Sequence, residues 1–492
     1  MKYSRIVLIG LLILAQLAAS CTSTDTQVET TDTTTDTTTA SVPETEPIYS
    51  APDVDYGGAE FTIIDRDPIT TRWIMSTYGD IRCDEESGEP INDALFKRNR
   101  QVEEELNIKL IPHLVGNTER ANTLRTLVLA GDDSVDAAMI RGDNIPMLLN
   151  EPNLLINLHN IDTLNLSNPW WDQNFNDTFA FGGNQFICTG SMSLYTQLAP
   201  ILVFFSEDLA QEYSIPNLYD LVREGKWTLD KMMEFSEMVA TDLDGNTIMN
   251  EKDRYGTLTE YAQINNFIPA SGIRYAVRNS DGTISPTLNN EKMVDLIQKI
   301  VPFINNSAVN CIANLFSANY SNVYYEMNIP MFKNNQCLFS PGQLLVFFEF
   351  RAMEADYGII PLPKFDEEQD SYYSCHSITW TTMFCVPSTN KNADMAGHVA
   401  EALGYYSQQF VTPAVIDTSV HGKYLRNDDS AEMLDIVLNN ILYDIGSTYD
   451  WGGCTYAMTT LAKSNSIDFA SAYASLEPSI KSGIEATLKT LN

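Results

Sequence analysis

This 492-residue chain lacks the sequence motifs of the common enzyme classes. It contains no HExxH, GxSxG, Walker or GxGxxG pattern, and its five histidines are well separated. No motif therefore predicts a zinc protease, a serine hydrolase or a nucleotide-binding site, and we expect neither an enzyme nor a catalytic cofactor. The paired carboxylates of a glycoside hydrolase are defined by their distance in space, so a glycan-active enzyme stays an alternative.

Positive charge is also scarce. The chain has 30 Lys and Arg against 65 Asp and Glu, a formal net charge of −35. Nucleic acid and anionic membrane surfaces would repel such a protein, so we expect no nucleic-acid partner.

Cysteines are few, and their spacing is not that of metal ligands. Seven follow Cys21, without a CxxC pair or zinc-ligand spacing. We expect mostly structural thiols: either some are free and buried, or one pair forms, with Cys375 and Cys385 as the candidates.

The chain has one long apolar run, at residues 6–14, and it is too short for the roughly 20 residues that span a bilayer. Lys2 and Arg5 precede it, and small residues lead to Cys21. This order is typical of a lipoprotein signal peptide at residues 1–20, with Cys21 as the acylated residue, although Ala18 stands where such signals usually have Leu. The prediction is an extracytoplasmic protein anchored to the cell membrane by lipid.

Residues 21–54 are rich in Thr, Asp, Glu, Ser and Pro. Such a segment has too little apolar surface to offset the entropy of ordering, which predicts a disordered tether.

The remaining part, about 440 residues, is too long for one core and predicts two lobes. Strand patterns at 61–65, 108–114 and 136–140 alternate with helix patterns at 91–106 and 119–130. This alternation is typical of an α/β fold with a parallel sheet. The expected lobes are residues 55–165 plus about 315–385, and a helix-rich second lobe of 166–314 plus about 386–492.

One loop has the spacing of a calcium site. Oxygen ligands fall at positions 1, 3, 5, 7, 9 and 12, where position 7 supplies a backbone carbonyl. The residues are Asp242, Asp244, Asn246, Ile248, Asn250 and Asp253. Thr247 replaces the usual Gly at position 6 and Asp253 the usual Glu, so we expect weak, structural Ca²⁺ binding; a plain Asx-rich turn is the alternative.

Aromatic residues in polar or Gly-rich surroundings suggest a sugar site. A sugar ring has an apolar face and a rim of hydroxyls, so it binds to flat aromatic side chains beside polar groups. The candidate ligand-binding residues are Trp171, Asp172, Tyr373, Trp380 and Trp451. Trp227 is assigned to packing.

Five segments together resemble the type 1 extracellular solute-binding lipoproteins of ABC importers: residues 92–107, 216–233, 242–256, 356–363 and 422–435. The resemblance implies a two-lobed periplasmic-binding-protein-like fold of type II with a ligand cleft between the lobes. It also implies a carbohydrate ligand, ABC permease subunits as partners and a monomer that closes by hinge motion. A surface sensor or adhesin on the same fold is a further alternative.

Overall fold

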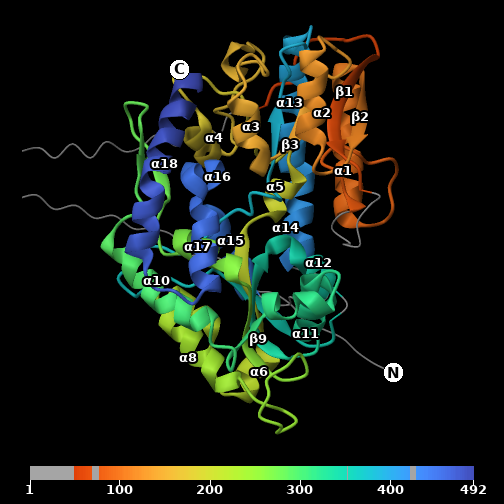
Figure 1. Cartoon of the computed structure of the whole chain (residues 1–492). Helices are drawn as coiled ribbons and strands as arrows, with labels where there is room; N and C mark the ends of the chain where they lie inside the picture. Colours follow the sequence, from red (N-terminus) through yellow and green to blue (C-terminus); the bar gives the residue numbers. More distant parts are fainter. Residues whose placement is uncertain (1–48, 69–76, 352, 421–427, 492) are drawn as a thin grey trace, which may run out of the picture. The chain divides into compact units, whose positions relative to one another are not determined.

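Two β-sheets, each covered by helices, carry the fold in this computed structural model, which describes residues 49–68, 77–351, 353–420 and 428–491 (Figure 1). These residues belong to the compact unit Pro47–Asn492. The predicted signal peptide, the acylated Cys21 and the tether as far as residue 48 lie outside the described residues. Within the described part, no helix is both long and apolar enough to cross a bilayer.

The first sheet has the strand order β12-β3-β1-β2. Its strands are β1 (Ala59–Arg66), β2 (Ile108–Val115), β3 (Ala137–Arg141) and β12 (Thr382–Cys385). β1, β2 and β3 are parallel and β12 is antiparallel to β3. The helices α1 (Pro90–Leu106) and α2 (Arg120–Leu129) connect the parallel strands, which confirms the predicted alternation. With α13 (Ala393–Tyr406), which packs on α1, these elements form the first lobe.

Local sequence explains where α1 begins and ends. The Glu89 carboxylate accepts a hydrogen bond from Asn92 N at 2.9 Å, and Pro90 occupies the first turn, where no backbone donor is needed. Asn107 ends the helix in the left-handed conformation, at φ 48°.

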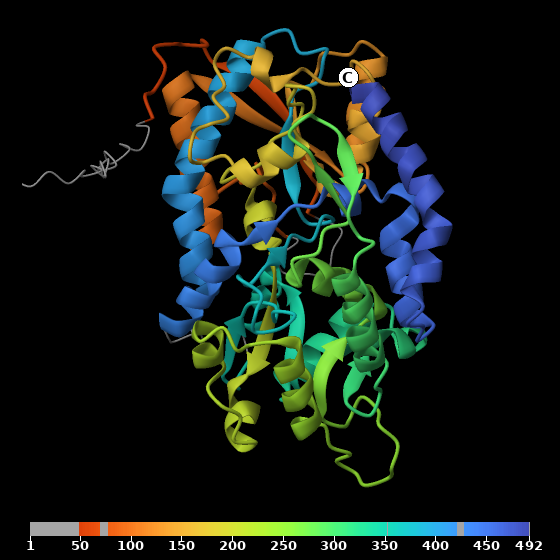
Figure 2. The same ribbon diagram turned by 90° about the vertical axis from the view of Figure 1, so that its left-hand side faces the viewer.

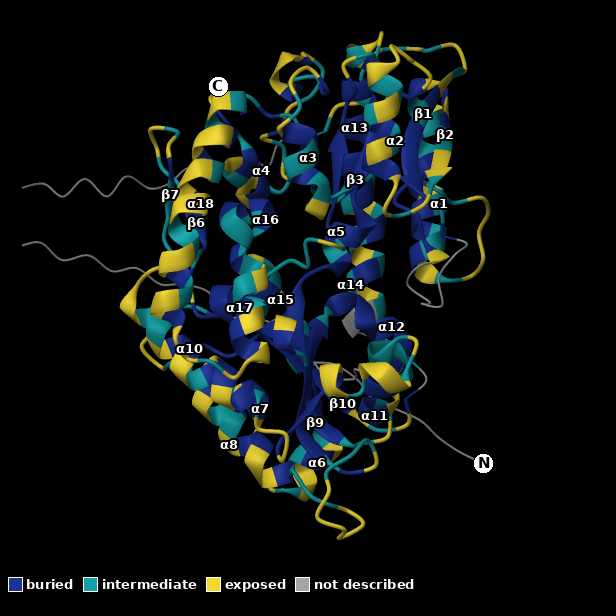
Figure 3. Ribbon diagram, in the orientation of Figure 1, coloured by how far each residue is buried: buried dark blue, intermediate teal, exposed yellow. Residues whose placement is uncertain are grey.

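The second sheet has the strand order β10-β4-β9-β5-β8. Its strands are β4 (Ile201–Ser206), β5 (Tyr255–Thr259), β8 (Asn310–Ile312), β9 (Cys337–Gln343) and β10 (Tyr357–Ile360). β4 is buried throughout, as its continuous apolar sequence requires. α8 (Leu229–Val239) and α10 (Glu291–Ile304) pack on this sheet, and their outer sides are exposed (Figure 3).

The two sheets are joined by short connections at facing edges. From α5 (Leu194–Leu198) the chain enters β4, and from β11 (Ser374–Cys375) it returns to β12. Pro200 and His376 pair across these two connections. β5, β8 and β9 end, and β4 begins, at one edge of the second sheet, while β1 and β3 end, and β12 begins, at one edge of the first. The carboxyl edges of the two sheets therefore face each other (Figure 2).

The lobe boundaries differ from those predicted. β9 and β10 lie within residues 315–385, assigned to the first lobe, but they flank β4 in the second sheet. α13, assigned to the second lobe, packs on α1. An apolar strand pattern does not specify which sheet a strand joins, because both sheets bury similar strands.

The first lobe includes contacts from residues that were assigned to the tether. Tyr49, predicted to lie in the tether, stacks on Tyr405 of α13 with ring centroids 4.3 Å apart. Its hydroxyl also donates to the Glu105 carboxylate. Residues 49–54 therefore lie against the first lobe, since Tyr49 has an aromatic partner there.

The assignments of Trp227 and of the thiols agree with the structure. Trp227 is fully buried and its indole N–H donates to Pro361 O at 2.9 Å. The seven cysteines of the described residues are free, so Cys375 and Cys385 do not pair.

Candidate functional site

Two cavities lie at the carboxyl edge of the second sheet, and Asn266 lines both; we call them the cleft cavities. The first, of about 210 Å³, is lined by Glu260, Gln263, Asn266, Asn322, Tyr324, Gln343 and Trp380, among others. The second, of about 340 Å³, is lined by Asn265, Asn266, Tyr275, His376, Ser377 and Thr379, among others. The volume of the second falls within the range of about 300–1,000 Å³ that is typical of ligand sites, and the polar side chains that line both cavities suit a small hydroxylated molecule.

Strand ends position the first cleft cavity. Glu260 follows β5 directly, Gln343 is the last residue of β9, and Ile201 is the first residue of β4. Side chains at the carboxyl ends of neighbouring strands converge outside the sheet, which is where ligands bind in open α/β folds. The side chain of Gln263 is fixed by β9, because its amide donates to Pro341 O at 3.2 Å.

Glu260 is the one carboxylate among the described residues that line the first cavity. Its carboxylate has no hydrogen-bond partner among the described residues, and burial raises its pKa. The pKa of Tyr324 is raised by burial and then by the negative charge of Glu260, which places the two side chains near each other. A half-buried carboxylate without a donor is a group that a ligand can satisfy.

Trp380 is the one sequence-predicted aromatic residue that lines a cleft cavity. It lies on the connection from β11 to β12, beside Ser377 and Thr379 of the second cavity. The guanidinium carbon of Arg66, at the carboxyl end of β1, lies 5.2 Å from its ring centroid. A cation against the ring keeps Trp380 in place beside the cavity.

Trp171 and Asp172 line a different, mainly apolar cavity of about 220 Å³, between α5 and the helices α14 (Thr412–Val420) and α15 (Asp428–Asn439). Trp171 is 3% exposed and its N–H donates to Glu401 at 3.0 Å. Asp172 is the N-cap of α4 (Gln173–Phe179). The structure therefore gives Trp171 a packing role and Asp172 a capping role.

Trp451 and Tyr373 line none of these cavities. Trp451 is 7% exposed, its N–H donates to Thr487 Oγ1 at 3.0 Å, and its ring stacks on Tyr449. The ring is also closely packed against a residue distant in sequence: a side chain at Gly483 would collide with the indole. The Tyr373 hydroxyl donates to Asp370 at 3.1 Å. We correct the sequence-based prediction for Trp451, whose ring and donor are both occupied within the protein.

Sequence reasoning missed Glu260, Asn266, Tyr324 and Gln343. One signal was available: Glu260 directly follows the strand β5, and residues just beyond strands of an α/β protein often face the ligand. Asn266 and Tyr324 lie on helical segments, where nothing in the sequence marks the side that faces the cavity.

A hydrogen-bonded chain crosses the connections between the sheets. The Tyr443 hydroxyl donates to Asp172 Oδ2 at 2.7 Å and lies 2.9 Å from His376 Nδ1. Because that hydroxyl has one proton, His376 donates to it from Nδ1. Burial lowers the pKa of His376 to about 3, so the imidazole is neutral.

The predicted calcium loop brings three carboxylates together. Oxygens of Asp242, Asp244 and Asp253 lie within 4.8 Å of one another. Thr247, at loop position 6, has φ 69°, the left-handed conformation that Gly usually supplies there. Backbone donors from Thr247 and Gly245 lower the pKa of Asp242. The donor set is all oxygen, and each carboxylate oxygen keeps a lone pair, so these residues fit Ca²⁺.

Comparison with solved structures identifies the fold. The galacto-N-biose/lacto-N-biose I-binding protein of an ABC transporter from Bifidobacterium longum is 11% identical, with a TM-score of 0.58 over 87% of this chain and 98% of that chain. The sugar-binding protein MalE from Xanthomonas citri is 14% identical, with a TM-score of 0.58 over 88% and 98%. An ABC substrate-binding protein from Listeria monocytogenes, in complex with cycloalternan, is 14% identical, with a TM-score of 0.54 over 88% and 99%.

No protein-family model matches the chain. No curated protein matches it either. The likeness to the solved structures nevertheless extends over nearly their whole length, so the chain has the two-lobed periplasmic-binding-protein-like fold.

Proposed function

We propose that the chain is the solute-binding protein of an ABC importer and that it binds a sugar or oligosaccharide in the cleft cavities. The observation that carries the proposal is the position of Glu260, Gln343 and Trp380 at the carboxyl edge of the second sheet, beside a connection between the sheets. An aromatic ring next to hydrogen-bonding groups suits a sugar. The solved structures of the same fold include sugar-binding proteins of ABC transporters.

Binding in the cleft would act by closure. A ligand that contacts both lobes only when they are close together favours the closed state, and a permease that binds this state receives loaded protein. A glycoside hydrolase, the alternative, needs two carboxyl groups that flank one bond. In the described linings of the cleft cavities the carboxylates are Glu260 and Asp444, and backbone N–H groups of Tyr275 and Gly446 already occupy Asp444.

A glycan panel tests binding against catalysis. Purified protein is incubated with mono- and oligosaccharides while melting temperature and released sugars are recorded. A binding protein shows a rise in melting temperature without product. Stabilisation by peptides alone, or release of shortened glycans, would refute the proposal.

The lipid anchor is part of the same proposal. An acylated Cys21 followed by a Thr-rich segment would hold the carrier at the membrane, close to its permease, as an extracytoplasmic monomer. Replacing Cys21 by Ser in expressing cells should move the protein from the membrane fraction to the medium. Retention of the variant in the membrane would contradict the anchor.

We also propose that Asp242, Asp244, Asn246, Ile248, Asn250 and Asp253 bind a structural Ca²⁺. The convergence of three carboxylates in a loop with left-handed Thr247 supports it. The loop precedes β5 and Glu260 follows it, so the two lie at opposite ends of this strand, and the effect of the ion would be on stability.

A further inference from the structure

The described residues that line the cleft cavities include acidic but no basic side chains. Among the described residues that line them there is no Lys and no Arg. The two carboxylates of the lining are Glu260 and Asp444. Whether a carboxylate can bind a ligand therefore depends on the hydrogen-bond donors that the protein already supplies to it.

Asp444 is fully engaged by the protein. It is the N-cap of α16 (Ile445–Tyr449), where its carboxylate accepts from Gly446 N at 2.7 Å and from Tyr275 N at 2.6 Å. Three or more backbone donors stabilise the charge and also occupy its lone pairs. Asp444 is thus a structural group that leaves little capacity for a ligand.

Glu260 differs from Asp444 in its hydrogen bonding. No described residue donates to its carboxylate, and the one cause that shifts its pKa is desolvation, which raises it. A cation nearby would lower that pKa. Arg66, the cation beside Trp380, is 2% exposed and lies against the rings of Tyr195 and Trp380.

We infer that the cleft selects a saccharide that carries no acidic group and that places a hydrogen-bond donor, a hydroxyl or a protonated amine, on Glu260. The inference rests on the proposed function and specifies its ligand class. A uronate, sulfate or phosphate group in the first cavity would lie beside an unneutralised carboxylate in a partly desolvated site. Like charges in such a site repel strongly, whereas a donor supplies the missing partner.

A comparison of two variants tests the premise without any ligand. Glu401 is also a buried carboxylate with a raised pKa, but it accepts from Asn165 N, Asn168 Nδ2 and Trp171 Nε1. Glu260→Gln removes an unsatisfied charge, so its melting temperature should equal or exceed that of the parent. Glu401→Gln, the matched control, should melt lower because the new amide nitrogen cannot accept the hydrogen bond that Asn168 Nδ2 donates to Glu401 Oε2. A fall in melting temperature for Glu260→Gln as large as that for Glu401→Gln would overturn the inference.

The selectivity itself is measured by calorimetry with three classes of oligosaccharide matched in length and linkage: neutral, amino-substituted and uronate. We expect the neutral or amino members to bind, the uronates to bind at least about tenfold more weakly, and Glu260→Gln to narrow that difference. Uronate binding equal to or tighter than that of the neutral member would overturn the inference alone. Failure of every saccharide to bind would overturn the proposed function together with the ligand class that depends on it.

Discussion

The indole of Trp380 stacks on the phenol ring of Tyr195, with ring centroids 5.8 Å apart and an interplanar angle of 28°. Tyr195 is 1% exposed and its hydroxyl donates to Tyr78 O at 2.8 Å, so its ring is fixed in the first lobe. Trp380, on the connection between the sheets, is partly exposed to the first cleft cavity. A rigid ring of the first lobe therefore supports an aromatic side chain of the cleft.

Replacing Trp380 by Ala should weaken saccharide binding by about tenfold or more, because an aromatic platform is lost at the cavity wall. Titration calorimetry on the folded variant measures this change. The matched control is Trp451→Ala, which should lower the free energy of unfolding by about 3–5 kcal/mol while the folded fraction binds normally. Loss of affinity in the Trp451 variant alone would reverse this assignment.

His376 should make stability depend on pH. Its pKa is about 3 in the folded protein because burial disfavours the charged imidazole, whereas an unfolded histidine titrates near 6.5. Between these values the unfolded chain binds a proton that the folded protein does not, so the free energy of unfolding falls as pH falls below about 6.5. The contribution of His376 to the slope should approach about 1.4 kcal/mol per pH unit, the value for one proton.

Urea unfolding of the parent and of His376→Gln at several pH values between 4.5 and 7.5 measures this slope. The variant should be less stable at pH 7, since its bond to Tyr443 changes, but its stability should fall less steeply toward acid. His159, whose side chain is exposed, provides the control: His159→Gln should retain the parental slope. Equal slopes for the parent and His376→Gln would show that His376 is not buried neutral.

Calcium should stabilise the protein through the Asp242–Asp253 loop. With a dissociation constant of about 10⁻⁴–10⁻³ M, 10 mM Ca²⁺ should add about 1.4–2.7 kcal/mol to the free energy of unfolding. Asp244→Ala should abolish the difference in melting temperature between Ca²⁺ and EDTA. The control Asp281→Ala removes an Asx-turn carboxylate that accepts from Thr283 N and belongs to no carboxylate group, and it should leave the difference intact. If EDTA left the melting temperature of the parent unchanged, the proposal of a bound Ca²⁺ would be contradicted.

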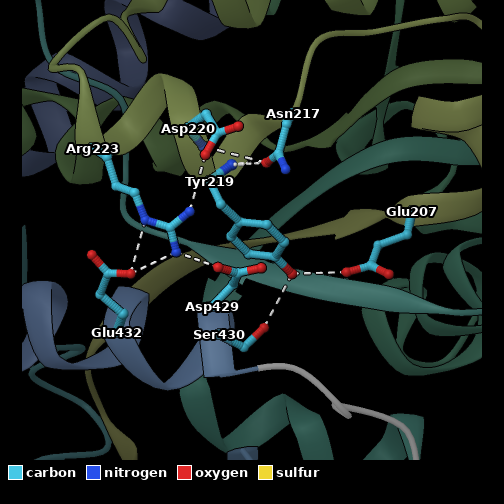
Figure 4. Close-up of polar contacts among 8 residues, drawn as sticks. All are labelled: Glu207, Asn217, Tyr219, Asp220, Arg223, Asp429, Ser430 and Glu432. Carbon is cyan, nitrogen blue, oxygen red and sulfur yellow. Dashed lines mark hydrogen bonds and ion pairs between the residues drawn. The ribbon is translucent and has the colours of Figure 1, made fainter.

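Two neighbouring contacts between α7 (Leu218–Arg223) and α15 should differ in energy (Figure 4). The Tyr219 hydroxyl donates to Glu207 at 2.8 Å, lies 3.1 Å from Ser430 Oγ, and belongs to a side chain that is 5% exposed. Tyr219→Phe should cost about 1–2 kcal/mol, because the hydroxyl of a buried side chain and its hydrogen bonds to Glu207 and Ser430 are removed.

Arg223 bonds Asp220, Asp429 and Glu432, but on the surface, where water and salt screen the charges. Arg223→Ala should therefore cost less than Tyr219→Phe, and the difference should grow with added salt. Chemical denaturation at low and high NaCl compares the two variants. A larger loss for Arg223→Ala at high salt would contradict this ranking.

Local patterns predicted the elements of the first lobe well. The apolar spacing of α1 and the strands on either side of it are properties of short segments, and the helix begins and ends at capping residues that are visible in the sequence. The same holds for Trp227, whose neighbours form two helices around it. The choice of aromatic site residues was less successful, because polar or Gly-rich neighbours in sequence do not report burial. Trp451 has such neighbours and is nevertheless packed against α18 (Phe469–Leu491).

The sequence by itself determined the alternating strands and helices, the acidic charge, the N-terminal signal pattern and the spacing of the Asp242–Asp253 loop, since each depends on residues close together in the chain. Only the tertiary structure decided that β9 and β10 join the second sheet and that Glu260, Tyr324, Gln343 and Trp380 surround one cavity. These four residues come from separate segments, and the free energy that brings them together comes from burial of the strands between them. That no described residue donates to Glu260 is likewise a property of the folded chain, because it depends on which distant groups are packed beside this carboxylate.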